Sequence, residues 1–191
     1  MFATDAVVIY DLEWTAWPES RAERFAHPDR PPEIIQIGAV AVSVADGFAE
    51  RGHFETLVRP TLNPVLSDYI VDLTGIRQAD VDRDGVDFAP ALDAFLAFVG
   101  TGPVTVACYG NDSDFVQVNC TLKNLPMPAR LVDYVDLRAA LDARGLVDRT
   151  WNSGSLAQRL GIEDEGREHN ALDDVRTIVR ALRHFRDAGK I

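Results

Sequence analysis

Two acidic side chains close the first apolar run of the sequence. Residues 6–13 alternate as a β-strand does, so Val7 and Ile9 share one face with Asp11 and Glu13. The two carboxylates then project from that face about 7 Å apart along the strand. Acidic groups beside a core are costly unless a cation neutralises them. The run therefore predicts either a metal-binding pair or two solvated acids where the strand ends.

A further acid borders the buried stripe of the helix predicted for residues 171–187. The stripe is set by apolar residues at helical spacing: Ala171, Val175, Ile178, Leu182 and Phe185. Asp174 borders this stripe, whereas Asp173 points away and is assigned to a capping box with Asn170 as the N-cap. His169 then lies just outside the helix. By itself it would be a surface histidine, but beside converging acids it is a candidate general base.

The remaining acid should follow the strand predicted for residues 103–109. The stretch after that strand offers Asp112 and Asp114. Asp112 lies on the same side of the next helix as Phe115 and Val116, whereas Asp114 should face solvent more. We choose Asp112 and keep Asp114 as the alternative.

Periodicity predicts that a mixed sheet positions these residues. Strand-like runs cover residues 6–13, 33–44 and 52–59, with a hairpin signal at Asp46-Gly47. The rest of the chain alternates, with helices at 88–100, 113–124, 137–144, 153–160 (Ser153 as N-cap) and 171–187, and strands at 103–109 and 131–135. This order favours an α/β fold with helices on both faces, and ligands beyond the carboxyl ends of the strands.

These residues resemble the three motifs of the DEDD-type 3′→5′ exonucleases, in the histidine-bearing (DEDDh) branch. The motifs are Asp11-Leu12-Glu13, the later Asp112, and His169-x-Ala171-x-x-Asp174. Segments 33–40 and 73–76 are similar to further blocks of the family, and the resemblance runs from residue 6 to about 185. The chain looks most like the histone-mRNA 3′ exonuclease subgroup, whose substrates are RNA, while other branches act on DNA.

The resemblance implies a ribonuclease H-like fold with a mixed five-stranded sheet. It also implies release of 5′-mononucleotides from the 3′ ends of single-stranded RNA or DNA, with RNA slightly favoured. All-oxygen ligands suit Mg²⁺ or Mn²⁺. Two such ions would stabilise the attacking and leaving oxygens of a phosphoryl displacement, with His169 as general base. The expected metal ligands are Asp11, Glu13, Asp112 and Asp174.

Candidate substrate-binding residues lie in the loop 14–32 and after the third strand. Trp14 and, less directly, Trp17 are placed to stack on a terminal base, or else to pack the loop onto the domain. Three arginines of that loop are either phosphate contacts or ordinary surface charge: Arg21, Arg24 and Arg30. By the family resemblance Leu73 and Ile76 wall the nucleotide pocket, although core packing explains them equally well.

Composition narrows the class of protein. The 191 residues are 47% hydrophobic and 26% charged, so we interpret residues 1–191 as a single soluble exonuclease domain. The net charge of −11 disfavours a tight binder of long duplex DNA. Cys108 and Cys120 form no disulfide framework or zinc spacing. No membrane-length apolar run is present, and we expect a cytoplasmic protein.

A different class of function keeps the fold and loses the activity. On that hypothesis the chain is a catalytically silent nucleic-acid-binding module. All five expected active-site residues are present, which favours the enzyme. The sequence leaves the oligomeric state open, with a homodimer as one alternative.

Overall fold

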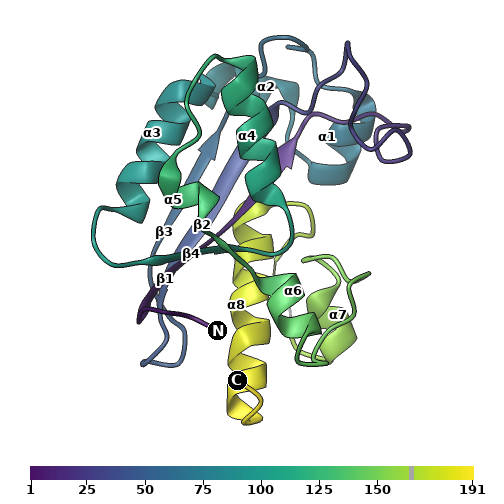
Figure 1. Cartoon of the computed structure of the whole chain (residues 1–191). Coiled ribbons are helices and arrows are strands. Elements are labelled where there is room, and N and C mark those ends of the chain that lie inside the picture. The colour runs from purple at the N-terminus through teal and green to yellow at the C-terminus, as the bar shows by residue number, and fades with distance from the viewer. Residues whose placement is uncertain (164–165) are drawn as a thin grey trace.

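A five-stranded sheet forms the centre of the molecule (Figure 1). The structure, a computed structural model, describes residues 1–163 and 166–191. The strands lie in the order β3-β2-β1-β4-β5, with β1 antiparallel to β2, β2 antiparallel to β3, and β4 parallel to both β1 and β5. Their bounds are β1 Ala6–Trp14, β2 Ile34–Ser43, β3 Ala49–Leu57, β4 Thr105–Cys108 and β5 Val135–Asp136. The predicted mixed five-stranded sheet is confirmed.

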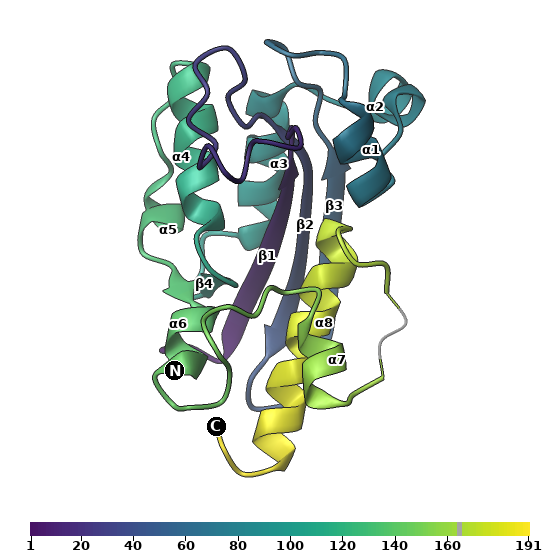
Figure 2. The ribbon, with the colours of Figure 1, turned by 90° about the vertical axis from the view of Figure 1, so that its right-hand side faces the viewer.

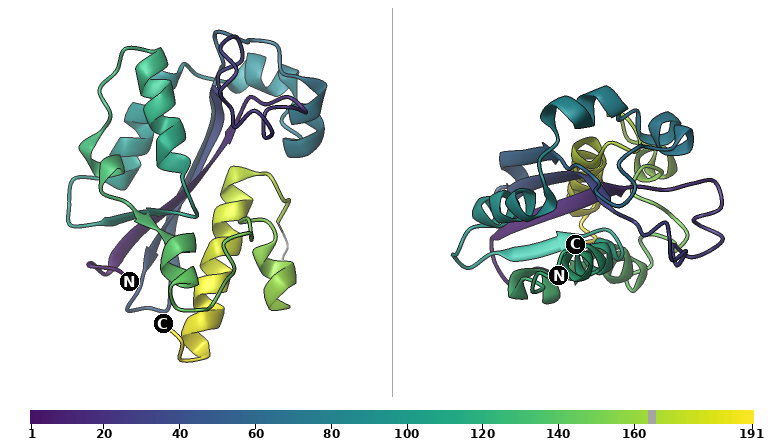
Figure 3. Two further views of the ribbon diagram at one scale, coloured as in Figure 1. Left: turned by 45° about the vertical axis from the view of Figure 1, so that its right-hand side comes forward. Right: turned by 90° about the horizontal axis from the view of Figure 1, so that it is seen from above.

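Helices cover both faces of this sheet (Figures 2 and 3). One face packs against α3 (Phe88–Val99), α4 (Asp112–Leu122) and α5 (Ala129–Val132). The opposite face packs against α6 (Leu137–Asp142), α7 (Leu156–Leu160) and α8 (Ala171–Asp187). Within the described ranges, no helix combines the length and apolar character that crossing a membrane requires.

The alternation of side chains along β1 divides them between the two cores that the helices form on either face of the sheet. Val8, Tyr10 and Leu12 contribute to the core beneath α3 and α4. Val7 and Ile9 contribute to the core beneath α8. Asp11 and Glu13 share the parity of Val7 and Ile9, so they project on the α8 side of the sheet.

Several local predictions are wrong. No helix was predicted between β3 and α3, yet α1 (Asp68–Thr74) and α2 (Gln78–Asp84) lie there. Each has only 7 residues, too few for a clear helical period. The strand predicted at 131–135 is α5 followed by the two-residue β5. Ser153 is not an N-cap, because α7 begins at Leu156 and Ser155 occupies the cap position without a side-chain hydrogen bond.

Candidate active site

The two acids of β1 lie buried beside the neighbouring strand. Asp11 is 7% exposed and Glu13 8%. In the antiparallel register Asp11 faces Gly38, and Glu13 faces Gln36. A glycine and an amide opposite the two carboxylates leave room above them and add no apolar wall.

Helix α8 begins directly over these two strands. A Cβ on Gly38 would overlap the backbone of Ala171 and Leu172, so the missing side chain permits the close approach. Gln36 fixes the helix start, because its Oε1 accepts a hydrogen bond from the Ala171 N–H at 3.0 Å. The approach brings Asp174, which is 4% exposed, to the acids of β1.

The turn before α8 presents His169 to the same acids. The predicted N-cap is confirmed, since the Asn170 side chain accepts from the Asp173 N–H at 3.1 Å. His169 adopts φ 63°, a left-handed conformation that turns the chain sharply into the helix. Its ring offers a nitrogen within 4.8 Å of carboxylate oxygens of Glu13 and Asp174. Asp173 does not complete a capping box, because its carboxylate accepts from the Arg167 N–H at 3.0 Å instead.

The acid after β4 that reaches this group is Asp112, which opens α4. Asp112 is 6% exposed, whereas Asp114 lies on the exposed side of the helix. The Ser113 hydroxyl donates to the Leu131 carbonyl at 2.5 Å and holds this first turn down. The structure therefore brings Asp112, and not Asp114, to the acids of β1.

Electrostatics place the four acids in one cluster, named here the acid cluster: Asp11, Glu13, Asp112 and Asp174. Burial raises the pKa of Asp11, and the charges of the other three acids raise it further. Burial, followed by the charges of Asp174 and Asp112, raises the pKa of Glu13. Burial also raises the pKa of Asp112 to about 7, although hydrogen bonds and the Arg138 charge act in the opposite direction.

This donor set fits divalent cations. Across the described chain, no ion pair joins Asp11, Glu13 or Asp112 to a basic side chain. Buried carboxylates that repel one another are stabilised when a cation binds between them. Oxygen ligands with one imidazole at the rim match the preferences of hard divalent ions.

The predicted substrate-binding residues lie in different settings. Trp14 stacks on Phe115, with ring centroids 3.8 Å apart, and meets Phe25 edge-on. Trp17 lies under the Arg30 guanidinium at 5.2 Å from its ring centroid. Arg21 and Arg24 are exposed. Leu73 and Ile76 pack in a small apolar core.

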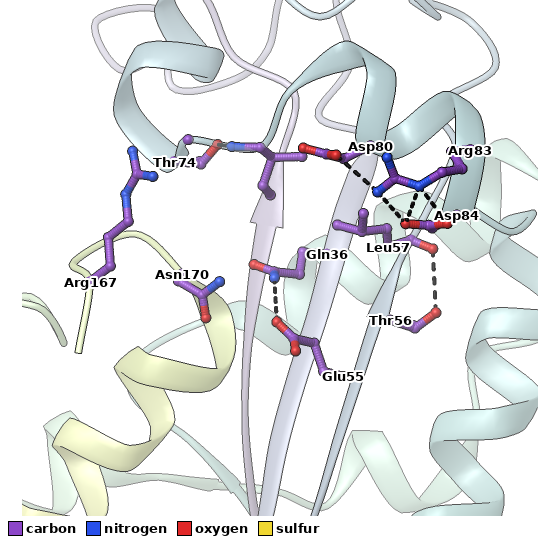
Figure 4. Close-up of a pocket in the computed structure, with 12 residues that line it drawn as sticks. Gln36, Glu55, Thr56, Leu57, Thr74, Asp80, Arg83, Asp84, Arg167 and Asn170 are labelled. Atoms are coloured by element: carbon purple, nitrogen blue, oxygen red, sulfur yellow. Dashed lines mark hydrogen bonds and ion pairs between the residues drawn. The ribbon is translucent and has the colours of Figure 1, made fainter. Parts of the chain in front are cut away.

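A cavity of about 470 Å³ lies on the β2–β3 side, and its lining includes Gln36, the strand partner of Glu13, and Asn170, which follows His169 (Figure 4). Gln36 lies between Asn170 and Glu55, and its Nε2 donates to Glu55 at 2.8 Å. Arg167 extends toward Gly75, whose φ is 71° and where a Cβ would overlap the guanidinium. Sequence reasoning did not single out Gln36, Gly38 or Arg167. The polar Gln36 inside an apolar strand was the one signal that could have indicated a special position.

Comparison with known proteins places the chain in a family. The exonuclease family model matches residues 8–182. The chain therefore belongs to the exonuclease family, and the predicted resemblance is confirmed.

Individual relatives support this assignment. ERI1 exoribonuclease 2 from Mus musculus is 30% identical over 205 residues, which cover 95% of this chain and 28% of that protein. The chain thus spans less than a third of that relative. The nuclease domain of 3′hExo, a DEDDh family member bound to rAMP, superposes with a TM-score of 0.84 at 26% identity, covering 98% of this chain and 94% of that one. Cell-death related nuclease 4 superposes with a TM-score of 0.78 at 28% identity, covering 97% and 64%.

Proposed function

We propose that this chain, as one exonuclease domain, removes 5′-mononucleotides from the 3′ ends of single-stranded nucleic acid, with RNA slightly favoured over DNA. The observation that carries the proposal is the convergence of four buried acids and His169 from three separate parts of the chain. Membership of the exonuclease family and relatives described as exoribonucleases support it.

Two Mg²⁺ or Mn²⁺ ions are the proposed cofactors. Asp11 would contact both, Glu13 and Asp174 would hold one, and Asp112 would act on the other mainly through its hydration shell. When bound, such ions neutralise the acid cluster and stabilise the charge that develops on the phosphoryl oxygens. Within the chain itself, burial of the four carboxylates would hold them in place for these ions.

His169 is the proposed general base. It takes a proton from the attacking water while the water oxygen forms a bond to phosphorus and the bond to the leaving O3′ breaks. The leaving oxygen gains a proton, so the products are a 5′-mononucleotide and a strand shortened by one residue. The ring is one-third exposed, which allows the proton to pass on to solvent.

The substrate grip is proposed for residues beside the cluster. Trp14 and Ile76 would flank the terminal nucleotide, with Leu73 behind Ile76. Phe115 stacks on the Trp14 ring, and this packing would hold it in place for a base on the other side.

Digestion of 5′-labelled single-stranded RNA and matched DNA tests this function. We expect a ladder that shortens from the 3′ end with Mg²⁺ or Mn²⁺ and stops with EDTA. The variant His169→Ala should lose at least about a hundredfold in rate, the lower range for a general base. A folded protein that cleaves neither strand with any metal would leave the silent binding module as the better hypothesis.

A further inference from the structure

Arg138 places its guanidinium beside the loop that carries Asp112. A Cβ on Gly110 would lie 2.8 Å from Arg138 Nη2, so the absence of a side chain at Gly110 leaves room for the guanidinium in this position. Gly110 also has φ 113°, a conformation that favours glycine. Within the described part of the chain, the Arg138 guanidinium makes no hydrogen bond or ion pair, whereas Arg149 pairs with Asp142 at 3.1 Å.

The surroundings of Arg138 are ordered and leave open space. Asp136 Oδ1 accepts from the N–H groups of Gly110 and Ala139, both at 3.1 Å. This carboxylate thus connects the loop after β4 with the first turn of α6, the turn that contains Arg138. A cavity of about 240 Å³ opens there, lined by Asp136, Arg138, Ala139 and Arg149. The guanidinium therefore lies beside open space without an ion-pair partner in the described chain, although its charge acts on nearby Asp112.

The order of the strands sets where Arg138 lies relative to the reaction. His169 directly precedes α8 and Asp174 lies in its first turn, and α8 packs over β2 and β1. Asp112 follows β4, and Arg138 follows β5, the edge strand on that side. Across the sheet the sequence of positions is thus His169, the β1 acids, Asp112 and then Arg138.

In-line attack determines on which side of the phosphorus the retained strand lies. If His169 activates the water, as in the proposed function on which this inference rests, the leaving O3′ lies on the opposite side of the phosphorus. That side is the one occupied by Asp112. The leaving oxygen belongs to the retained strand, so the next phosphate of that strand continues toward β5 and Arg138.

We propose that Arg138 binds the phosphate one nucleotide 5′ of the scissile bond. A guanidinium matches a phosphate with paired N–H donors, and one without an internal partner is free to do so. In a chain with a net charge of −11, one cation at this point would hold the strand in register. Arg138 is a binding residue in this proposal and does not touch the reacting atoms.

Two RNA dinucleotides test the assignment, one with a 5′-phosphate and one without. Only the first carries a phosphate at the proposed position, so the ratio of their kcat/KM values isolates the contact. We expect the wild type to prefer the phosphorylated dinucleotide about tenfold or more, the scale of a charge-assisted hydrogen bond. Arg138→Ala should bring the ratio close to one, and Arg138→Lys should retain part of it.

Arg144→Ala is the matched control, because Arg144 is exposed and its guanidinium donates, within the described residues, only to the Ala140 carbonyl at 2.7 Å. It should keep the wild-type ratio. The ratio is taken within each variant, so partial unfolding cancels, and Arg138→Gln replaces the alanine variant if that one does not fold. A wild type without preference, or an Arg138 variant that slows both substrates equally, would overturn the proposal. Failure of the wild type on both dinucleotides and on longer RNA would remove the proposed function itself.

Discussion

Two regions of this molecule bury carboxylates, and they treat the negative charge in opposite ways. Glu33, just before β2, has a side chain only 1% exposed and paired with the Lys123 ammonium at 3.0 Å. Three backbone N–H groups also donate to it, at 2.8, 2.9 and 2.9 Å: Thr61, Leu62 and Asn63. Although burial alone would raise the pKa of Glu33, these donors outweigh it and the pKa is lowered.

The carboxylates of the acid cluster are also buried, yet the pKa values of Asp11 and Glu13 shift in the opposite direction. Burial and mutual repulsion raise the pKa of Asp11, Glu13 and Asp112. Neither Asp11 nor Glu13 pairs with a cation of the described chain. We infer that Glu33 is a structural anchor whose neutralising groups lie within the chain. In the proposed function, the acid cluster would instead take its cations from solution.

The largest expected effect is on catalysis. Asp11→Asn removes a charge at the centre of the acid cluster and should lower exonuclease activity by about a hundredfold or more, because losing even an indirect metal partner costs about 10- to 100-fold. Its metal-free stability should stay the same or rise, because one mutual repulsion disappears. Single-turnover digestion and thermal melting in EDTA measure the two quantities. A clear fall in metal-free stability would contradict the view that this acid is repelled there.

Glu33→Ala should show the opposite pattern. Its removal leaves three backbone donors and Lys123 without their acceptor, and we expect a loss of about 3 kcal/mol in the free energy of unfolding. Urea denaturation measures it. Activity per folded molecule should change far less than in Asp11→Asn. If Glu33→Ala unfolds at the wild-type urea midpoint, the anchor interpretation is wrong.

The next largest effect is expected in the pH dependence of stability, to which the acid cluster and Glu33 contribute with opposite signs. In the metal-free protein the folded state of the acid cluster holds protons that the unfolded chain has released, so its contribution falls as pH rises from about 4 toward 7. Glu33 contributes in the opposite sense, with stability present above its unfolded pKa and lost as pH falls.

Chemical denaturation at pH 5 and pH 8 in EDTA checks this sign. Mg²⁺ added at pH 8 should restore stability, by about 2.7 kcal/mol at a hundred times its dissociation constant. A metal-free protein that is equally stable at both pH values, and that does not respond to Mg²⁺, would contradict the comparison.

The smallest effect is expected for Asp114→Asn. Asp114 is exposed and lies two residues after Asp112. The free energy of unfolding of the variant should therefore change by no more than about 0.5 kcal/mol. Activity should stay close to wild type, while Asp112→Asn loses it. Parallel assays of the two variants decide between these neighbouring acids. Equal losses in both would show that Asp114 also serves the site.

Much of the candidate site could be predicted from local pattern. The alternation in β1 placed Asp11 and Glu13 on one face, and the structure has them there. The helical period placed Asp174 at the edge of a buried stripe, with Asn170 as N-cap. Such periodicities are short-range properties, because each depends only on the few residues around it.

Other features could not be predicted from short-range sequence patterns. The short α1, α2 and β5 have too few residues for a clear period. The contact between Arg138 and Gly110 joins positions 28 residues apart (138 − 110), with α4, α5 and β5 between them in the sequence. Nothing local distinguishes this arginine from the others of the chain.

The sequence by itself therefore determined the types of the reactive groups and the faces on which they lie. Tertiary structure alone decided that these faces meet: Gly38 lets α8 approach β2, and Gln36 holds the helix start. It also decided which buried carboxylate received a lysine and which did not. Hydrophobic packing sets these long-range distances, and electrostatic energies depend on distance and burial more than on residue type.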